Sequence, residues 1–193
     1  MSPFSCKGNA DRVTPMSPLK STFAQGLLAS GPAPEYAEQL MLYGQFVGDW
    51  RTRTTAYLAD GTQEHTEWDV RFSWVLEGRA VQDLWITPPA RDGAGAAWHD
   101  PGNRYSTTLR VYDPSQDAWH ILWINPPSGT ILRQFGKRVG HEIVQDGEAD
   151  SEGRMTRWVY RDIAASTFRW CNERSSDAGR SWTLLQEMRA YRV

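Results

Sequence analysis

The stretch Trp68-Asp-Val-Arg-Phe-Ser-Trp74 decides the fold of this chain. Aromatic and apolar residues alternate along it with polar ones, and this period of two places one face of a β-strand in a core and the other in water. Similar short, Trp-rich patterns recur from about residue 46 to residue 192, and most of the ten Trp fall inside them. Many antiparallel strands in series must close or stack to protect their edges. The sequence therefore predicts an all-β barrel.

We expect about ten strands, separated by short turns rich in Gly, Pro and Asp. Their expected ranges are 46–58, 62–76, 79–87, 104–113, 117–125, 129–136, 138–145, 154–163, 166–174 and 181–192. Such short links favour sequential antiparallel neighbours over crossing connections. The prediction is an antiparallel up-and-down barrel.

The first turn, at residues 59–62, allows two registers. A two-residue turn would align Trp50 with Arg71, whereas a three-residue turn with Gly61 in a bulge would place Trp50 on the same face as Trp68. We favour the second register because it keeps the aromatic residues together.

A different composition precedes the strands. Residues 1–31 mix Pro and Gly with Ser, Thr and Ala, which is typical of an irregular arm, with one short helical turn around 22–29. Pro and Glu at 32–35 suit a helix N-terminus, so one helix is expected over about 35–44. Its apolar residues recur at helical spacing and should pack on one end of the barrel. We divide the chain into an arm, 1–31, and a barrel domain, 32–193.

Bulk composition excludes several classes of function. The 193 residues fit one domain, and 21 basic against 23 acidic residues give no electrostatic case for nucleic acid or an anionic membrane. No stretch approaches the ~20 apolar residues of a membrane helix, and the first residues lack a secretory signal pattern. Cys6 and Cys171 are best interpreted as two reduced thiols. We expect a soluble, cytoplasmic protein.

Motifs for metals, cofactors and nucleophiles are missing from the sequence. The four His lie far apart and form no short ligand pair: His65, His99, His120 and His141. There is no Gly-x-Ser-x-Gly elbow, no His beside either Cys in sequence and no phosphate-binding loop after a strand. We therefore expect neither a cofactor nor a metal.

The 88–103 segment is a long connection, rich in Gly and Ala, that carries Trp98-His99-Asp100. A loop of this length inside a compact domain is more often functional than idle. Two interpretations stay open, a lid over the barrel mouth and a surface excursion.

The inner face of the barrel follows from the same alternation. In the second strand the aromatic set Trp68, Val70, Phe72 and Trp74 is expected inside, and the set His65, Glu67, Asp69, Arg71 and Ser73 outside. The alternative, with the charged set inside, would create a stripe able to transfer protons. By the same logic, one face of the strand around 117–125 carries Trp119, Ile121 and Trp123, opposite Tyr105, Thr107, Leu109 and Val111. The inner set continues in the later strands with Trp158, Tyr160, Phe168, Trp170, Trp182, Leu184, Gln186 and Met188.

The strand around 117–125 is apolar on both faces, so its outside should be covered by the helix or by a second subunit.

Several of these segments resemble a known family. They are Phe46-Val-Gly-Asp-Trp50, Trp74-Val-Leu-Glu-Gly-Arg79, Val111-Tyr-Asp-Pro114 with Trp119, Arg161-Asp-Ile163 with Phe168 and Trp170, and Ser176-Asp-Ala-Gly-Arg-Ser-Trp182. Together they resemble the bacterial lipocalin-like (calycin) β-barrels known only as a domain of unknown function, over about residues 40–193. The resemblance implies the barrel fold and no common reaction.

The Gly-x-Trp opening is shared more loosely with lipocalins, fatty-acid-binding proteins and nitrobindins. Nitrobindin-like haem binding would imply a Gly-x-Trp-x-Gly-x-Gly opening and a His near the C-terminus. This chain has Arg51 and Arg53 after Trp50 and no His beyond His141, so we expect no haem by that route.

Three functions are carried forward. The first is binding of a hydrophobic or aromatic small molecule, because a ten-stranded barrel tends to leave a cavity and Trp supplies flat surfaces. Its expected ligand-binding residues are Trp50, Thr52, Thr54, Trp68, Phe72, Trp74, Gln82, Tyr105, Trp119, Trp123, Tyr160, Trp170 and Gln186. The second is a cofactor-independent isomerase or cyclase of a natural-product pathway, with one of His65, Glu67, Asp69, His99, His120, Arg169 or Glu187 indispensable inside the cavity. The third is a homodimeric interaction module with a filled barrel.

Overall fold

The computed structural model describes residues 22–87 and 104–193, and Cys6, His99 and the 88–103 loop lie outside these residues. The helical elements are α1 (Phe23–Leu27), α2 (Ala37–Gly44) and the short 3-10 turns η1 (Pro34–Tyr36) and η2 (Pro126–Ser128). The strands are β1 (Leu28–Ala29), β2 (Gly48–Tyr57), β3 (Gln63–Val75), β4 (Ala80–Thr87), β5 (Arg104–Asp113), β6 (Ala118–Asn125), β7 (Thr130–Val139), β8 (Glu142–Gly147), β9 (Met155–Arg161), β10 (Thr167–Ser175) and β11 (Thr183–Arg192).

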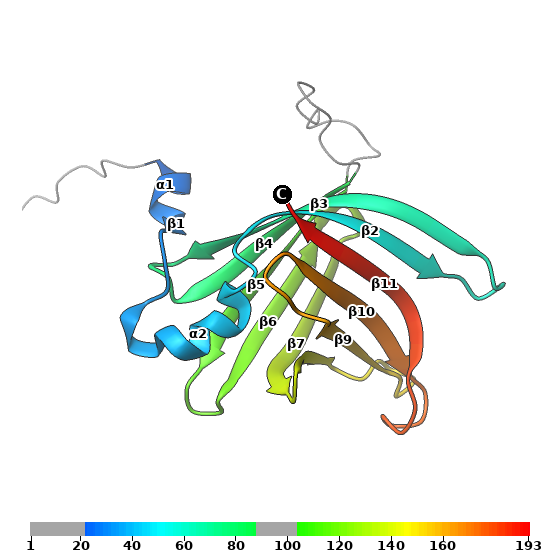
Figure 1. Cartoon of the computed structure of the whole chain (residues 1–193). Coiled ribbons are helices and arrows are strands. Elements are labelled where there is room, and N and C mark those ends of the chain that lie inside the picture. The colour runs from blue at the N-terminus through cyan, green and yellow to red at the C-terminus, as the bar shows by residue number, and fades with distance from the viewer. Residues whose placement is uncertain (1–21, 88–103) are drawn as a thin grey trace, which may run out of the picture.

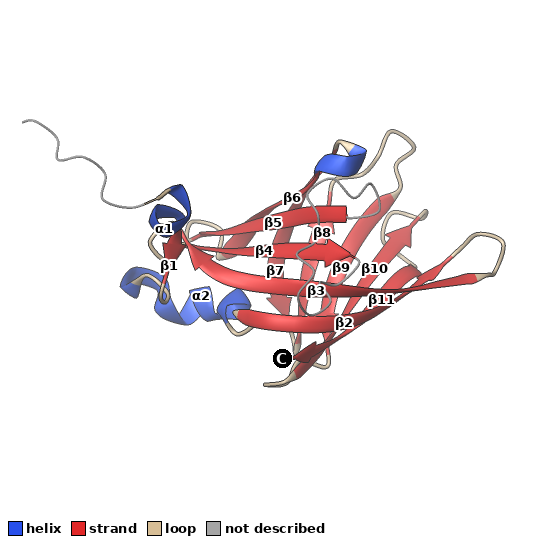
Figure 2. Ribbon diagram, turned by 90° about the horizontal axis from the view of Figure 1, so that it is seen from above, coloured by secondary structure: helices blue, strands red, loops and turns tan. Residues whose placement is uncertain are grey.

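Strands β2 to β11 form a closed, ten-stranded antiparallel up-and-down barrel, as the sequence predicted (Figure 1). Each strand pairs with its neighbours in sequence, and the ring closes where β11 pairs with β2. The two-residue β1 pairs with Val75 and Trp74 of β3, beyond the point where β2 begins. Figure 2 shows α1 and α2 together with β1 at one end of the strands.

Helix α2 is the expected capping helix. It buries Leu40 and Tyr43 toward the barrel and contacts β4 and β5. The Tyr43 ring meets Trp119 edge-on at 4.8 Å between centroids, and its hydroxyl accepts a 2.9 Å hydrogen bond from Gln145 Nε2. This end of the barrel is therefore filled with side chains.

The first hairpin adopts the favoured register. Trp50 pairs with Val70 and Thr52 with Trp68, so the Trp50 face and the Trp68 face coincide. Gly61 has a φ of +84°, and Leu58 N–H donates to the Thr62 carbonyl across the three intervening residues. The glycine-bulge prediction is confirmed because a residue without a Cβ adopts this backbone conformation at little cost.

One expected turn is misplaced. The predicted break at residue 137 falls inside β7, which continues to Val139 and turns at Gly140, where φ is +61°. Gly136 is instead an inward-facing position, where an added Cβ would lie 2.5 Å from the Tyr43 hydroxyl. Its glycine makes room for the capping helix and marks no turn.

The inner face of β5 is the reverse of the prediction. The pairs Trp85–Ser106, Arg110–Ile121 and Tyr112–Trp119 turn the even-numbered residues of β5 inward. Tyr105, Thr107, Leu109 and Val111 therefore lie on the outer face. The apolar pattern misleads here because the buried charge of Arg110 is compensated by Asp83 on β4.

A β-bulge in β11 causes a second difference. Asn172 pairs with Gln186, but the next residue of β10, Glu173, pairs with Leu184, which leaves Leu185 as the extra residue. Leu184, expected inside, accordingly pairs with Glu173 on the charged outer side of β10. Beyond the bulge Gln186 and Met188 keep their expected inward places.

Within the described residues no helix is long and apolar enough to span a membrane. The same residues contain no group of three or more His, Cys, Asp or Glu arranged to hold a metal ion.

Candidate functional site

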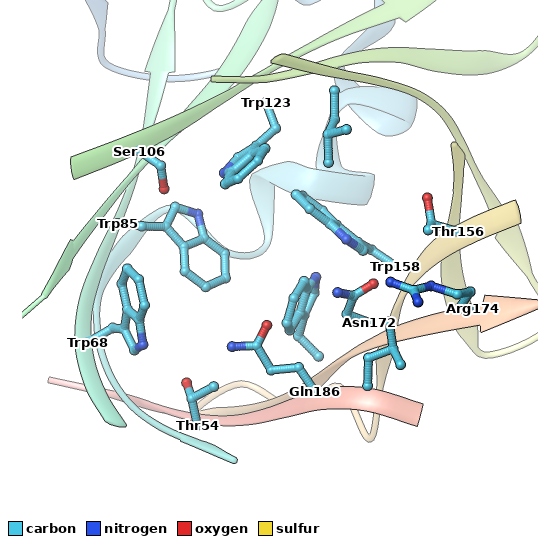
Figure 3. Close-up of a pocket in the computed structure, with 13 residues that line it drawn as sticks. Thr54, Trp68, Trp85, Ser106, Trp123, Thr156, Trp158, Asn172, Arg174 and Gln186 are labelled. Atoms are coloured by element: carbon cyan, nitrogen blue, oxygen red, sulfur yellow. The ribbon is translucent and has the colours of Figure 1, made fainter. Parts of the chain in front are cut away.

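A cavity of about 250 Å³ lies inside the barrel, on the side of the core away from α2 (Figure 3). Nine of the ten barrel strands contribute to it, since only β8 supplies no lining residue. The lining residues are Thr54, Trp68, Trp85, Ser106, Trp123, Leu132, Thr156, Trp158, Trp170, Asn172, Arg174, Leu185 and Gln186.

Five Trp form one continuous aromatic wall. Trp68 meets Trp85, and Trp85 meets Trp170, at centroid distances of 6.2 and 5.7 Å. Trp158 then joins Trp170 at 5.2 Å and Trp123 at 5.7 Å. All four contacts are edge-to-face, an arrangement that aromatic rings prefer over direct stacking. Each ring is thereby held by its neighbours, so the cavity keeps a stiff apolar wall.

Several polar atoms around the cavity are buried without a hydrogen-bond partner among the described residues. They are Thr54 Oγ1, Trp85 Nε1, Trp170 Nε1 and Asn172 Oδ1. A buried polar group left unpaired costs about 1–3 kcal/mol. The cavity lining is therefore less stable than a fully paired one would be, which is typical of a surface shaped for a ligand rather than for packing alone.

Thr54 and Thr52 offer a direct measurement of that cost. Both lie buried on the inner face of β2, but Thr52 Oγ1 donates a 3.1 Å hydrogen bond to the Trp68 carbonyl, whereas the Thr54 hydroxyl has no partner in the described part. Thr54→Val should raise the free energy of unfolding by about 1 kcal/mol, and the matched Thr52→Val should lower it by a similar amount. Urea unfolding measures both changes, provided that the slope of the free energy of unfolding against urea concentration is the same in all variants. Equal effects of the two substitutions would contradict the difference in hydrogen bonding between the two hydroxyls.

A buried ion pair lies in the core between the cavity and α2. Asp83 and Arg110 are both fully buried, and Asp83 Oδ2 is 2.7 Å from Arg110 Nη1. Asp83 Oδ1 accepts from the Thr108 N–H at 2.7 Å, and Arg110 Nη2 donates to the Tyr160 hydroxyl at 3.0 Å. The guanidinium also lies 5.1 Å from the centre of the Tyr43 ring.

Burial and charge shift the pKa values of these groups in opposite ways. Burial raises the pKa of Tyr160 to about 12, and it raises the pKa of Tyr43 as well. Burial alone would lower the pKa of Arg110, but attraction from Asp83 outweighs it and the pKa ends above its usual value. Both tyrosines are thus neutral and the arginine charged at neutral pH. None of the three lines the cavity, so we assign this cluster to stability.

Five of the thirteen expected ligand-binding residues line the cavity, namely Thr54, Trp68, Trp123, Trp170 and Gln186. Six others are buried elsewhere in the core, namely Trp50, Thr52, Phe72, Trp74, Trp119 and Tyr160. Gln82 and Tyr105 lie on the outer face, where Gln82 donates to Thr107 Oγ1 at 2.9 Å. For these two, the expected inward orientation is wrong because the register of β4 and β5 turns Trp85 and Ser106 inward instead.

Sequence reasoning omitted eight lining residues from the expected site: Trp85, Ser106, Leu132, Thr156, Trp158, Asn172, Arg174 and Leu185. Trp158 was placed on the inner face but not in the site. The β10 alternation continues inward through Asn172 to Arg174, and this signal was present in the sequence.

The six described candidates for acid–base catalysis all lie outside the cavity. They make cross-strand or turn contacts on the outer surface: His65 with Thr55, Glu67 with Arg53, Asp69 with Arg51, His120 with Asp113, Arg169 with Asp162, and Glu187 with Tyr57. His99 lies outside the described residues. The polar face of β3 is thus a solvated surface, which is the interpretation the sequence favoured.

No protein-family model and no curated protein matches the chain. Among solved structures, the barrel is similar to Rv2717c from M. tuberculosis, at 14% identity and a TM-score of 0.56, over 84% of this chain and 99% of that one. It is also similar to the S-type phycobiliprotein lyase CPES from Guillardia theta, at 8% identity and a TM-score of 0.52, over 79% and 91% of the two chains. At these identities the likeness concerns the fold alone, which is a lipocalin-like barrel.

Proposed function

We propose that this protein binds a planar, hydrophobic or aromatic small molecule in the Trp-lined cavity. The observation that carries the proposal is a cavity of about 250 Å³ walled by five edge-to-face Trp, inside a barrel whose other end is filled with side chains. Apolar pockets with a few convergent polar groups are the usual form of small-molecule sites. The similar fold of a phycobiliprotein lyase supports a ligand-binding barrel.

The cavity volume restricts the size of the ligand. Drug-sized ligands occupy pockets of roughly 300–1,000 Å³, so 250 Å³ lies just below that range. At ~30 Å³ for each water, the space equals about eight waters. A compound with one or two rings fits these limits.

Binding is favoured over catalysis by what lines the cavity. Its thirteen described residues include no His, Asp, Glu, Cys or Tyr, so an isomerase or cyclase that moves protons finds no acid or base among them. A homodimeric module was expected to have a filled barrel, and the cavity weighs against that function. Simple binding needs only the apolar wall and the few polar groups that the lining supplies.

Titration with 2-acetonaphthone, a neutral two-ring ketone, tests the proposal. We expect one molecule per chain by calorimetry, with quenching of Trp fluorescence. Trp158→Ala should weaken binding at least about tenfold, because it removes a ring from the middle of the wall. Native mass spectrometry of the purified protein can detect a natural ligand of similar size.

Trp182→Ala is the matched control. Trp182 does not line the cavity; Arg157 covers its ring at 4.0 Å and its Nε1 donates to the Gly179 carbonyl. Its substitution should leave the affinity unchanged. Failure of one- and two-ring aromatic compounds to bind, or equal losses in both variants, would refute the proposed site.

A further inference from the structure

Arg174 is the one charged residue among the thirteen that line the cavity. Most arginines of the barrel make ion pairs, for example Arg157 and Arg161 with Glu173 on the outer face. Arg174 is an exposed residue, and no ion pair or hydrogen bond joins its side chain to any described residue. A protein with a net charge of -2 thus presents an exposed positive charge without a partner at the edge of its cavity.

The groups around Arg174 give the cavity a polar end. Thr156 is the β9 residue paired with Arg174, and Asn172 precedes it by two residues on the same face of β10. Figure 3 shows these three side chains on one side of the cavity, with Trp68 and Trp85 on the opposite side. The cavity is therefore amphipathic along its length, with an aromatic end and a cationic end.

The position of Arg174 decides which charge on a ligand it favours. Because Arg174 is exposed, its guanidinium lies at the solvent edge of the cavity, where it can pair with a charged group of a ligand whose apolar body is inside. A carboxylate suits this position because its two oxygens match the fork of N–H donors on a guanidinium. None of the thirteen described lining residues is acidic, so none repels the carboxylate or competes with it. One arginine balances one negative charge, which favours a monocarboxylate over a dianionic phosphate.

We infer that the natural ligand is a planar aromatic or polyunsaturated monocarboxylic acid, with its carboxylate on Arg174 and its apolar body against the five Trp. This inference rests on the proposed function and narrows its ligand class. Arg174 sets the specificity and the orientation of the ligand, while the Trp wall provides apolar affinity that does not depend on charge.

A pair of probes of the same shape separates the two contributions. Neutral 2-acetonaphthone and anionic 2-naphthoate carry the same two rings and differ in the charge of the substituent. In the unmodified protein at neutral pH, 2-naphthoate should bind about three- to tenfold more tightly than 2-acetonaphthone, because its carboxylate can pair with the exposed Arg174 guanidinium. Arg174→Gln should abolish that preference and leave the affinity for 2-acetonaphthone within about twofold. Calorimetry measures all four constants.

Arg189→Gln is the matched control, since Arg189 is an exposed residue whose β2 partner, Arg53, lies on the outer face. It removes the same charge and should preserve the preference for 2-naphthoate. Equal affinity for both probes in the unmodified protein, or an undiminished preference in Arg174→Gln, overturns the carboxylate inference while leaving the binding site in place. If neither probe binds, the proposed function itself fails.

Discussion

Asp83→Ala should lower the free energy of unfolding by about 3–5 kcal/mol, more than any other single carboxylate substitution in the described barrel. Asp83 and Arg110 have no exposed side-chain surface, so removing the carboxylate leaves a guanidinium buried without a counter-charge. The Thr108 N–H also loses its acceptor. Urea unfolding monitored by Trp fluorescence measures the loss, and the variant should begin to unfold at markedly lower urea.

A double substitution distinguishes the ion pair from simple packing. Asp83→Leu combined with Arg110→Met removes both charges, and apolar replacements of a buried pair are often neutral or stabilising. The free energy of unfolding of the double variant should therefore be clearly higher than that of Asp83→Ala. Glu67→Ala is the surface control, because Glu67 faces Arg53 at 3.6 Å and both side chains are largely exposed. The urea midpoint of this variant should barely differ from that of the unmodified protein. A double variant less stable than Asp83→Ala would contradict this account.

Gly136→Ala should cost about 2–3 kcal/mol, the next largest effect. The added Cβ would lie 2.5 Å from the Tyr43 hydroxyl and 2.6 Å from Ile121 Cδ1, distances that real Cβ atoms do not adopt. Because Tyr43 belongs to α2 and is fully buried against the barrel, the helix must shift or the barrel must widen. Overpacking of this kind typically costs 1–3 kcal/mol. Thermal unfolding should reveal a lower midpoint.

Tyr43→Phe provides the diagnostic partner for that substitution. It deletes the hydroxyl that the new Cβ would meet, at the expense of the hydrogen bond from Gln145. The two effects should be non-additive, with the double variant more stable than the sum of the single losses implies. Gly31→Ala is the control, since no atom lies within 4 Å of a Cβ built there. Strict additivity would show that the clash is relieved in some other way.

The strands and the first hairpin were predictable because their signals are local. Alternation of period two identifies a strand, and the aromatic residues on both sides of Gly61 favoured the three-residue turn because it places them on one face. The face of β5 was not predictable in this way. Its inward residues include Ser106, Thr108 and Arg110, and each reads as a surface residue until Asp83 on β4 is known to meet Arg110. Hydropathy predicts the face of each residue separately, whereas the burial of a charged residue depends on whether a second residue supplies the opposite charge.

The site was only partly predictable for a different reason. The inward set of aromatic residues was largely correct, but the sequence does not say how deep each residue lies. Trp50 and Trp119 are buried near α2, where Trp50 Nε1 donates to the Phe46 carbonyl and Trp119 packs on Tyr43. Trp85 was left out of the expected site, which took Gln82 of the same strand, and Gln82 lies on the opposite face from Trp85. Depth is set by the helix that fills one end, and that is a tertiary feature.

The pairing of β2 with β11 has a consequence for how the chain reaches its native state. Every other contact between neighbouring barrel strands joins consecutive segments, but this one joins residues separated by most of the domain. Local hairpins form quickly, whereas a long-range pairing must first offset the entropy of closing a large loop. During synthesis one edge of β2 therefore stays unpaired until β11 has emerged from the ribosome. An unpaired edge is a template for intermolecular pairing, so the interval before ring closure is when this protein is most exposed to aggregation.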